Sequence, residues 1–231
     1  QRLGYFPFFD ALPSRLMQHL ATTVGLLLPH ETLQQYERRG FRKWHVPLIR
    51  AHLGIRAFGD GGRRCLVGAV LEASRSKDIL ADIINMGIEA LVHARYELPA
   101  FSTLRRAAQK AGAQVNHRYY HHIADALDDL QRLALTRLLS REERETTSAW
   151  QRLKQEPQQP TPKRIRAHLA HVQWWQSLPT ASQALDGVPE TKLQRFAEEA
   201  RALNVTRMNT LPEPKRYAFA VALIRVRTAQ D

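Results

Sequence analysis

The sequence predicts an all-α protein that consists of several helical parts, and three observations support this fold class. Apolar residues recur three and four positions apart along most of the 231 residues, which is the spacing of a helix with one buried face. Convincing alternation of apolar and polar residues, which marks a half-buried strand, is absent, and only Gly54–Phe58 reads as extended. Proline and helix-capping residues divide the periodic segments into separate helices.

The ends of the individual helices follow from residues with strong conformational preferences. Proline suits the first helical position because its φ angle is already fixed, and glycine stops a helix because it tolerates a left-handed conformation. Ser76 is an expected N-cap, and Pro47 either lies in the first turn of its helix or kinks it. These signals predict helices over residues 13–24, 29–39, 41–53, 63–75, 77–95, 102–115, 117–127 and 129–139, and three more near Pro162, Pro189 and Pro214.

Three breaks in this pattern predict how the chain is divided. The glycine-rich segment Gly59–Gly62 is the clearest flexible joint, residues 140–147 are charged and poor in apolar side chains, and Gln155–Pro162 is rich in proline and glutamine. We therefore expect a basic helical part over residues 1–62, a second helical part over 63–145 and a third over 146–231.

The charge balance favours a polyanionic partner. Lys and Arg outnumber Asp and Glu by 34 to 22, which gives a net charge of +12, and the excess is larger in residues 1–122 than in the rest. The single cysteine, Cys65, excludes an intramolecular disulfide and fits a reducing compartment. No apolar run approaches the roughly 20 residues of a membrane helix, so we expect a cytoplasmic protein without a membrane partner. Because the chain begins with Gln1, we interpret it as a piece of a longer protein.

The most informative segment is similar to a helix–turn–helix motif. Helix 77–95 is the support, Leu98–Pro99 ends it, and Ser102 can cap the next helix, 102–115. In that second helix, small apolar residues face inward and let it lie close to the support, whereas a polar stripe faces outward. Arginine and glutamine suit base contacts in the major groove, and hydroxyl groups at a helix N-terminus suit phosphate. The predicted DNA contacts here are Ser102, Thr103, Arg105, Arg106, Gln109 and Lys110.

An ordinary amphipathic helix with a solvated basic face would give the same pattern. The turn at 96–101 is also longer than in most helix–turn–helix motifs.

A second basic block, Tyr36–Arg64, mixes many arginines with few acids and suits contact with phosphate. Its predicted contacts are Arg38, Arg39, Arg42, Lys43, Arg50, Arg63 and Arg64. Its apolar residues are expected in the core: Phe41, Trp44, Leu48, Ile49 and Leu53. Further predicted DNA contacts are Asn116, His117 and Arg118, and Asn116 would also cap a new helix. Lys163 and Arg164 are predicted contacts as well. They belong to a short basic run, and in the alternative interpretation this run is only solvated.

Metal chemistry and catalysis have little support in the sequence. His117 and His121 are one turn apart, as are His168 and His171, but cysteine and acidic ligands at the spacing of a zinc site do not accompany them. Glycine-rich phosphate loops and nucleophile motifs are also absent. We therefore predict no metal, no cofactor and no enzyme activity for this chain itself.

Several segments resemble the N-terminal region of the Tn-three-type, or class II, replicative transposases. They are RLGYFP, ETLQQYERRGFRKWHVPLIRAHLGIRAF, INMGIEALVHARYELPAFSTLRRAAQ, TSAWQRLKQEPQQPTPKRIRAHL, VPETKLQRFAEEARALNV and PKRYAFAVALIRVR, and ELPAFSTL and FAEEARAL are the most specific. The resemblance covers essentially the whole chain. It implies a helical region that binds the terminal inverted repeats of a transposon as double-stranded DNA, in a bacterial, nucleoid-associated protein.

The resemblance also implies that catalysis belongs to a C-terminal domain with three carboxylates and Mg²⁺. On this resemblance, we expect this chain to lack that domain and the family's earliest N-terminal helices. The full-length protein would be a Mg²⁺-dependent transposase and a possible homodimer, and this chain would bind transposon ends sequence-specifically. The alternative is a helical protein-interaction scaffold within a transposase assembly, with only non-specific DNA contact. The predicted helices over 163–177, 189–203 and 214–229 suit that role.

Overall fold

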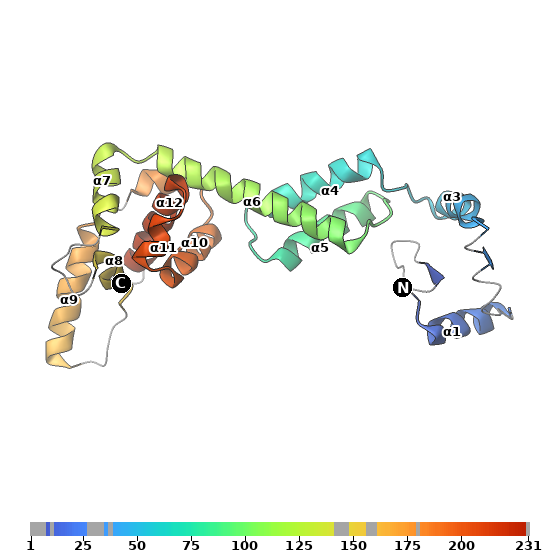
Figure 1. Ribbon diagram of the computed structural model, residues 1–231, viewed down its shortest axis with the longest axis horizontal. Helices are drawn as coiled ribbons and strands as arrows, with labels where there is room; N and C mark the ends of the chain where they lie inside the picture. The colour runs from blue at the N-terminus through green and yellow to red at the C-terminus, as the bar shows by residue number, and fades with distance from the viewer. Residues whose placement is uncertain are drawn as a thin grey trace. The chain divides into compact units, whose positions relative to one another are not determined.

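The computed structural model describes residues 8–9, 12–26, 35–36, 39–140, 148–155, 161–178 and 181–229 (Figure 1). These residues form eleven α-helices and one 3-10 helix, so the predicted all-α fold class is confirmed. The helices are α1 (Ser14–Val24), α3 (Arg42–Leu53), α4 (Asp60–Ala73), α5 (Leu80–His93), α6 (Phe101–Asp125), α7 (Asp129–Leu138), α8 (Ala149–Leu153), α9 (Pro162–Gln176), η2 (Ser182–Leu185), α10 (Glu190–Ala202), α11 (Val205–Asn209) and α12 (Glu213–Thr228). Among these helices, none has both the length and the apolar character to span a bilayer.

The chain divides into two compact units. The first unit comprises residues 1–70 and 84–108, and the second comprises 71–83 and 109–231. The three-part division at 62 and 145 stays a prediction.

Several predicted helix ends are confirmed to within a residue. The helix that was expected to begin at Pro13 begins at Ser14 and ends at Val24, and Gly25 caps it with a φ of 70°. Gly54, with a φ of 63°, ends α3 in the same left-handed conformation. Pro47 lies inside α3 and beyond its first turn, so the first of its two predicted positions is wrong.

The predicted flexible joint at Gly59–Gly62 is wrong, because α4 begins at Asp60 and includes both following glycines. A Cβ atom on Gly62 would lie 2.8 Å from Cδ2 of Phe58, and one on Gly61 would collide with the Tyr96 hydroxyl. These glycines therefore allow a close approach of aromatic rings to the helix, which is a packing requirement and not a sign of flexibility.

The core of the first unit lies between α4 and α5. Gly87 of α5 faces Leu66 and Val70 of α4, and a Cβ at this position would lie 2.7 Å from Leu66 Cδ1 and 3.0 Å from Val70 Cγ1. The side chains of Leu66 and Val70 thus fill the space that a Cβ atom at this position would need. Leu91 adds a fully buried side chain.

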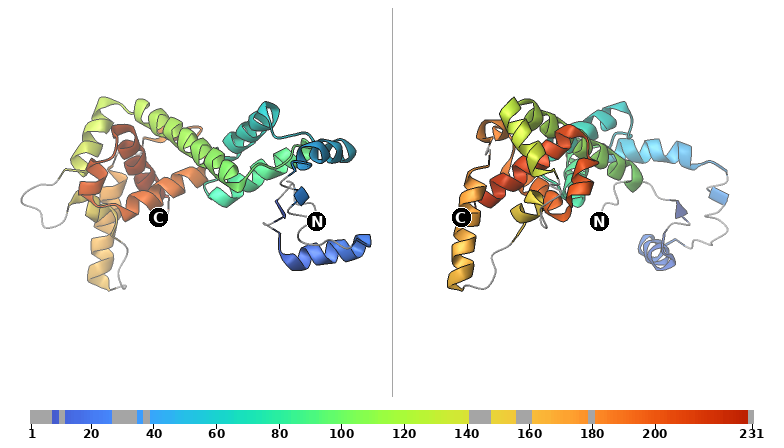
Figure 2. Two further views of the ribbon diagram at one scale, coloured as in Figure 1. Left: turned by 45° about the vertical axis from the view of Figure 1, so that its right-hand side comes forward. Right: turned by 60° about the vertical axis from the view of Figure 1, so that its left-hand side comes forward.

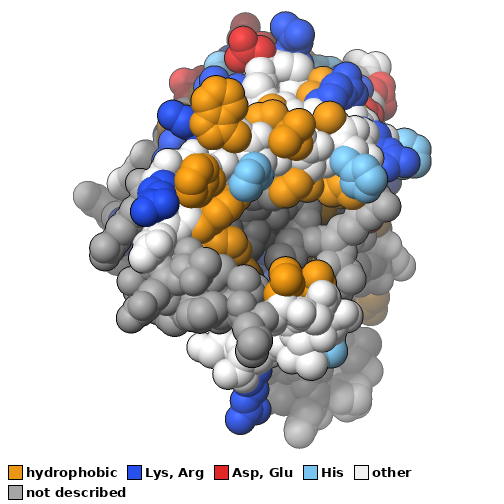
Figure 3. Space-filling view, turned by 90° about the vertical axis from the view of Figure 1, so that its right-hand side faces the viewer, with side chains coloured by type: hydrophobic (Ala, Val, Ile, Leu, Met, Phe, Trp, Pro, Cys, Tyr) orange, Lys and Arg blue, Asp and Glu red, His pale blue; other side chains and the backbone are white. Residues whose placement is uncertain are grey.

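The apolar residues of α3 are not in the core, contrary to the sequence prediction. Neither α1 nor α3 has a buried residue. Trp44 and Leu48 are each 68% exposed. The other exposed side chains of the predicted set are Phe41, Ile49 and Leu53. Figure 3 shows a face on which hydrophobic side chains gather with Lys and Arg at their edges. The helical spacing predicted an apolar face correctly, but the described residues do not cover it.

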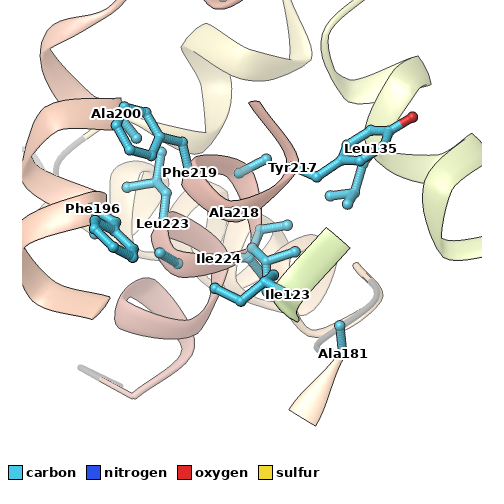
Figure 4. Packing of buried hydrophobic residues seen from close by; sticks show 14 of the residues in the cluster. Ile123, Leu135, Ala181, Phe196, Ala200, Tyr217, Ala218, Phe219, Leu223 and Ile224 are labelled. Carbon is cyan, nitrogen blue, oxygen red and sulfur yellow. The ribbon is translucent and has the colours of Figure 1, made fainter. Parts of the chain in front are cut away.

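The core of the second unit is centred on α12, which packs against α10 (Figure 4). Every residue from Tyr217 to Ile224 is buried, so this stretch of the helix has no exposed face. The ring centroids of Phe196 and Phe219 are 6.0 Å apart. A helix buried all round is the central element of its core.

One continuous helix replaces two predicted ones. α6 runs unbroken from Phe101 to Asp125, as the left view in Figure 2 shows, so the predicted break and N-cap at Asn116 are wrong. Leu104, Ala108, Ala111, Val115 and Ile123 are buried and continue one stripe past the predicted break. Because the buried stripe is uninterrupted, the helix keeps its packing through Asn116.

A buried lysine organises part of the second unit. The side chain of Lys192 in α10 is only 1% exposed. Its ammonium group donates to Asp78 Oδ1 at 2.6 Å, to Asn116 Oδ1 at 3.1 Å and to the Lys77 carbonyl at 3.1 Å. The three N–H donors of an ammonium group thus meet three acceptors, which is the condition for burying such a charge.

We expect Lys192→Met to destabilise the protein strongly, because it leaves the Asp78 carboxylate without its partner. Loss of one member of a buried pair costs about 3–5 kcal/mol. The loss of stability should lie at the lower end of this range, because 17% of the Asp78 side chain remains in contact with solvent. The measurement is the free energy of unfolding in urea.

Lys77→Met is the matched control, because Lys77 is exposed and supplies only its backbone carbonyl. Adding Asp78→Asn to Lys192→Met should recover part of the loss. Equal stability of the Lys192 and Lys77 variants would contradict this account.

Candidate nucleic-acid interface

The exposed face of α6 carries most of the predicted base contacts. Ser102, Thr103, Arg105, Arg106, Gln109 and Lys110 are all exposed. From Phe101 to Ala124 the helix contains four Lys or Arg residues and no carboxylate. This single helix therefore presents a cationic surface without acidic neighbours along its own length. Residues through Ala108 belong to the first unit and those from Gln109 to the second.

The opposite face of α6 explains why the cations are exposed. Leu104, Ala108, Ala111 and Val115 are buried, and Ala107 is half-buried, as the sequence predicted. Small side chains allow close packing on that side, so the long polar side chains have only the solvent side available. The helix begins at Phe101, with the Thr103 amide donating to the Ala100 carbonyl at 2.8 Å, so Ser102 lies in the first turn and the predicted cap at this residue is wrong.

The chain segment before α6 is held by Arg56, which the sequence reasoning did not include among the site residues. Arg56 and Tyr96 form an isolated parallel bridge, in which the Arg56 amide donates to the Arg95 carbonyl at 2.7 Å. The Glu97 amide donates back to the Arg56 carbonyl at 2.9 Å. The Arg56 guanidinium donates to the Ala94 carbonyl at 2.5 Å and lies 4.1 Å from the centroid of the Tyr96 ring. These contacts fix the backbone that leads into α6.

Arg50 was predicted to bind phosphate, but the structure gives it a partner inside the protein. Its Nη2 atom lies 2.5 Å from Glu97 Oε2, and the two side chains are 27% and 15% exposed. The pair connects α3 to the turn before α6. The guanidinium of Arg50 therefore positions that turn. This internal ion pair competes with the DNA contact that was predicted for Arg50.

The other predicted residues of the first unit lie on the surface. Arg39, Lys43, Arg63 and Arg64 are exposed. Arg42 is half-buried, with its guanidinium 4.4 Å from the centroid of the Phe8 ring. Arg38 lies outside the described residues, and the side chains of Lys163 and Arg164 in α9 also lie outside them.

In the second unit, Asn116 has a different role from its neighbours. Its side chain is half-buried and accepts the bond from Lys192, so it belongs to the lysine network. His117 and Arg118 are exposed. The rings of His117 and His121 are 4.4 Å apart between centroids, and the described residues contain no group of three metal-binding side chains that includes them.

Two comparisons with known proteins place this geometry in context. Residues 1–111 match the profile of a family described as "Domain of unknown function (DUF4158)". Over 193 residues, or 84% of its length, the chain is 25% identical to "Transposase for transposon Tn501" of Pseudomonas aeruginosa. The chain spans 20% of the length of that relative. It is thus a distant homologue of the N-terminal region of a transposase, as the resemblance in the sequence implied.

We expect Arg50→Gln and Glu97→Gln each to lower the melting temperature, because each leaves a partly buried charge without its partner. The double variant should lose less than the sum of the two, with a coupling energy of about 0.5–1 kcal/mol for a partly exposed pair. Thermal unfolding measures all three variants.

Arg63→Gln removes an exposed charge and serves as the control. Strictly additive losses would show that Arg50 and Glu97 do not interact in solution.

Proposed function

We propose that this chain is the DNA-binding part of a transposase and that it recognises the terminal inverted repeats of its element as duplex DNA. The observation that carries the proposal is the exposed face of α6, where arginine, glutamine, lysine and hydroxyl side chains stand together on a helix without carboxylates before Asp125. The distant homology to a transposase supports this assignment.

The first turns of α6 are suited to reading base pairs. A guanidinium from Arg105 or Arg106 can donate two hydrogen bonds to guanine, and the Gln109 amide can both donate to and accept from adenine. Ser102 and Thr103, in the first turn, can donate to phosphate while the helix N-terminus favours a negative charge. We assign these residues to the major groove because an α-helix fits there.

Non-specific affinity then comes from cations outside this helix. Arg39 and Lys43, close in sequence at the start of α3, and Arg63 and Arg64, in the first turns of α4, are exposed and suit contact with the phosphate backbone. Arg50 contributes less because Glu97 already neutralises it.

The proposed activity of this chain is recognition. Because the chain spans 20% of the related transposase, cutting and joining of DNA, the Mg²⁺ ions that support them and formation of a homodimer are proposed for the rest of the full-length protein. No catalytic group is assigned to the residues of this chain.

The alternative function, a protein-interaction scaffold, has less support once the burial of its apolar residues is known. The apolar residues of α10 and α12 that suggested it are buried within the second unit, as Phe196 and Phe219 illustrate. Their hydrophobic character is accounted for by the core of the chain itself.

Footprinting on the inverted repeats that flank the encoding element tests the proposal directly. Protection of the end sequence over random duplex DNA is expected. The affinity should fall steeply with salt, because each neutralised phosphate contributes about −0.9 to the slope of log K against log salt concentration. Equal protection of random DNA would favour the scaffold with non-specific contact, and absence of binding would exclude both DNA-binding forms.

Arg106→Ala should weaken binding to the inverted repeat by about 1–3 kcal/mol and reduce discrimination against random DNA, because a base contact is lost. Fluorescence anisotropy on both duplexes measures the two affinities.

Arg39→Ala removes the same charge from a predicted phosphate contact and is the matched control. It should weaken both duplexes alike. If the two variants behave identically, Arg106 contacts only the backbone.

A further inference from the structure

A cavity of about 400 Å³ lies beside the second half of α6 and within the second unit. α6 contributes Asn116, His117, Tyr120 and His121 to its lining, α10 contributes Glu199, and α12 contributes Lys215. Pro212 and Pro214, where α12 begins, also line it. The wall therefore combines several hydrogen-bond donors with rigid apolar surface.

The donors of this cavity are held close together. The rings of His117 and His121 are 4.4 Å apart between centroids. The ammonium group of Lys215 lies 5.6 Å from the centroid of the Tyr120 ring and 4.9 Å from that of Phe219, so the aromatic surface orients it. Burial, with a smaller contribution from Glu199, raises the pKa of Tyr120, so its phenol stays neutral and keeps a proton to donate.

Glu199 is the one carboxylate in the lining, and its charge is only partly balanced. Its Oε1 atom lies 3.2 Å from Nε of Arg195, but the same guanidinium also lies 3.6 Å from Glu198. The groups left to meet a ligand are two imidazoles, an ammonium, a phenol and an amide. This set favours an anion with several acceptor oxygens.

The cavity also continues the exposed face of α6. Arg106, Lys110, Ala113, His117 and His121 follow one another at spacings of three or four residues, so they share one side of the helix. Ala113 lines the cavity together with the histidines.

The length of α6 determines which part of the duplex its C-terminal turns would contact. Its 25 residues span about 37 Å at 1.5 Å per residue, whereas the major groove is only about 12 Å wide. If the first turns cross the width of the groove, the later turns leave it and pass over the sugar–phosphate backbone.

We propose that the cavity lined by His117, Tyr120, His121 and Lys215 binds a phosphate group of the duplex backbone and so fixes how far α6 enters the groove. The inference rests on the proposed function and assigns His121, Tyr120 and Lys215, which the sequence analysis did not include.

Two substitutions with opposite expected effects test the cavity in the full chain. Lys215→Ala should weaken binding to any duplex roughly tenfold, as expected for loss of a charged hydrogen bond, and lower the salt slope by about 0.9. Glu199→Gln removes the negative charge and should tighten binding about threefold, the size of a screened surface interaction. A folding defect cannot explain a gain in affinity.

The combined variant His117→Ala with His121→Ala should weaken binding to any duplex, because two hydrogen-bond donors to the phosphate are lost. His93→Ala is the matched control, because His93 is exposed and does not line the cavity, and it should keep the affinity of the wild type. If the wild type binds duplex DNA while these cavity variants keep its affinity and salt slope, the phosphate site is excluded and the proposed function stands.

If the wild type does not bind duplex DNA, the proposed function fails. A titration with inorganic phosphate alone then tests whether the cavity binds an anion. Chemical shift changes at the His117 and His121 rings, lost in Lys215→Ala, would support an anion site that serves free phosphate. Unchanged chemical shifts would overturn the phosphate site. A polyglutamate peptide that changes the chemical shifts of the two rings more than phosphate does would also overturn it, because the cavity would then prefer an acidic protein segment.

Discussion

The ammonium group of Lys192 imposes the strictest constraint in the second unit, because a charge buried to this extent needs all three of its hydrogen bonds. The acceptors come from residues 77 and 78 and from Asn116 in the middle of α6. α10 and α6 must therefore keep a fixed distance and rotation. With α6 held at Asn116, the next turn of the helix presents His117 and Tyr120 to the cavity that Glu199 of α10 also lines. A structural charge thus orients the donors of a proposed binding site.

The two faces of α6 combine packing and the proposed recognition in one element. Alanines at 108 and 111 are buried and keep the packed side narrow, and the long side chains of Arg106 and Lys110 occupy the other side. The Arg56 contacts and the Arg50–Glu97 pair fix the chain just before the helix begins. A recognition helix needs such support, because a base contact loses its specificity when the side chain is not held in position.

The sequence predicts the helical fold and the buried stripe of α6 because both depend on local periodicity. It fails at Asn116 and at Gly61–Gly62, where residues typical of turns have tertiary partners instead, namely Lys192 and the rings of Tyr96 and Phe58. It also misses Lys192, since a buried lysine and a surface lysine look alike in a sequence. The exposure of Trp44 was unpredictable for a related reason: apolar spacing shows that a face exists and does not show what covers it.

The same distinction applies to the net charge of +12, which overstates the cationic surface available to a polyanion. Lys192 is neutralised by Asp78 and Arg50 by Glu97, and the guanidinium of Arg132 donates to the carbonyls of Ala124 and Leu127. These cations are engaged in contacts within the protein that hold the fold together. The cations of α6 differ because no carboxylate accompanies them on that helix before Asp125. The position of each charge, more than its number, therefore determines which residues we assign to the duplex.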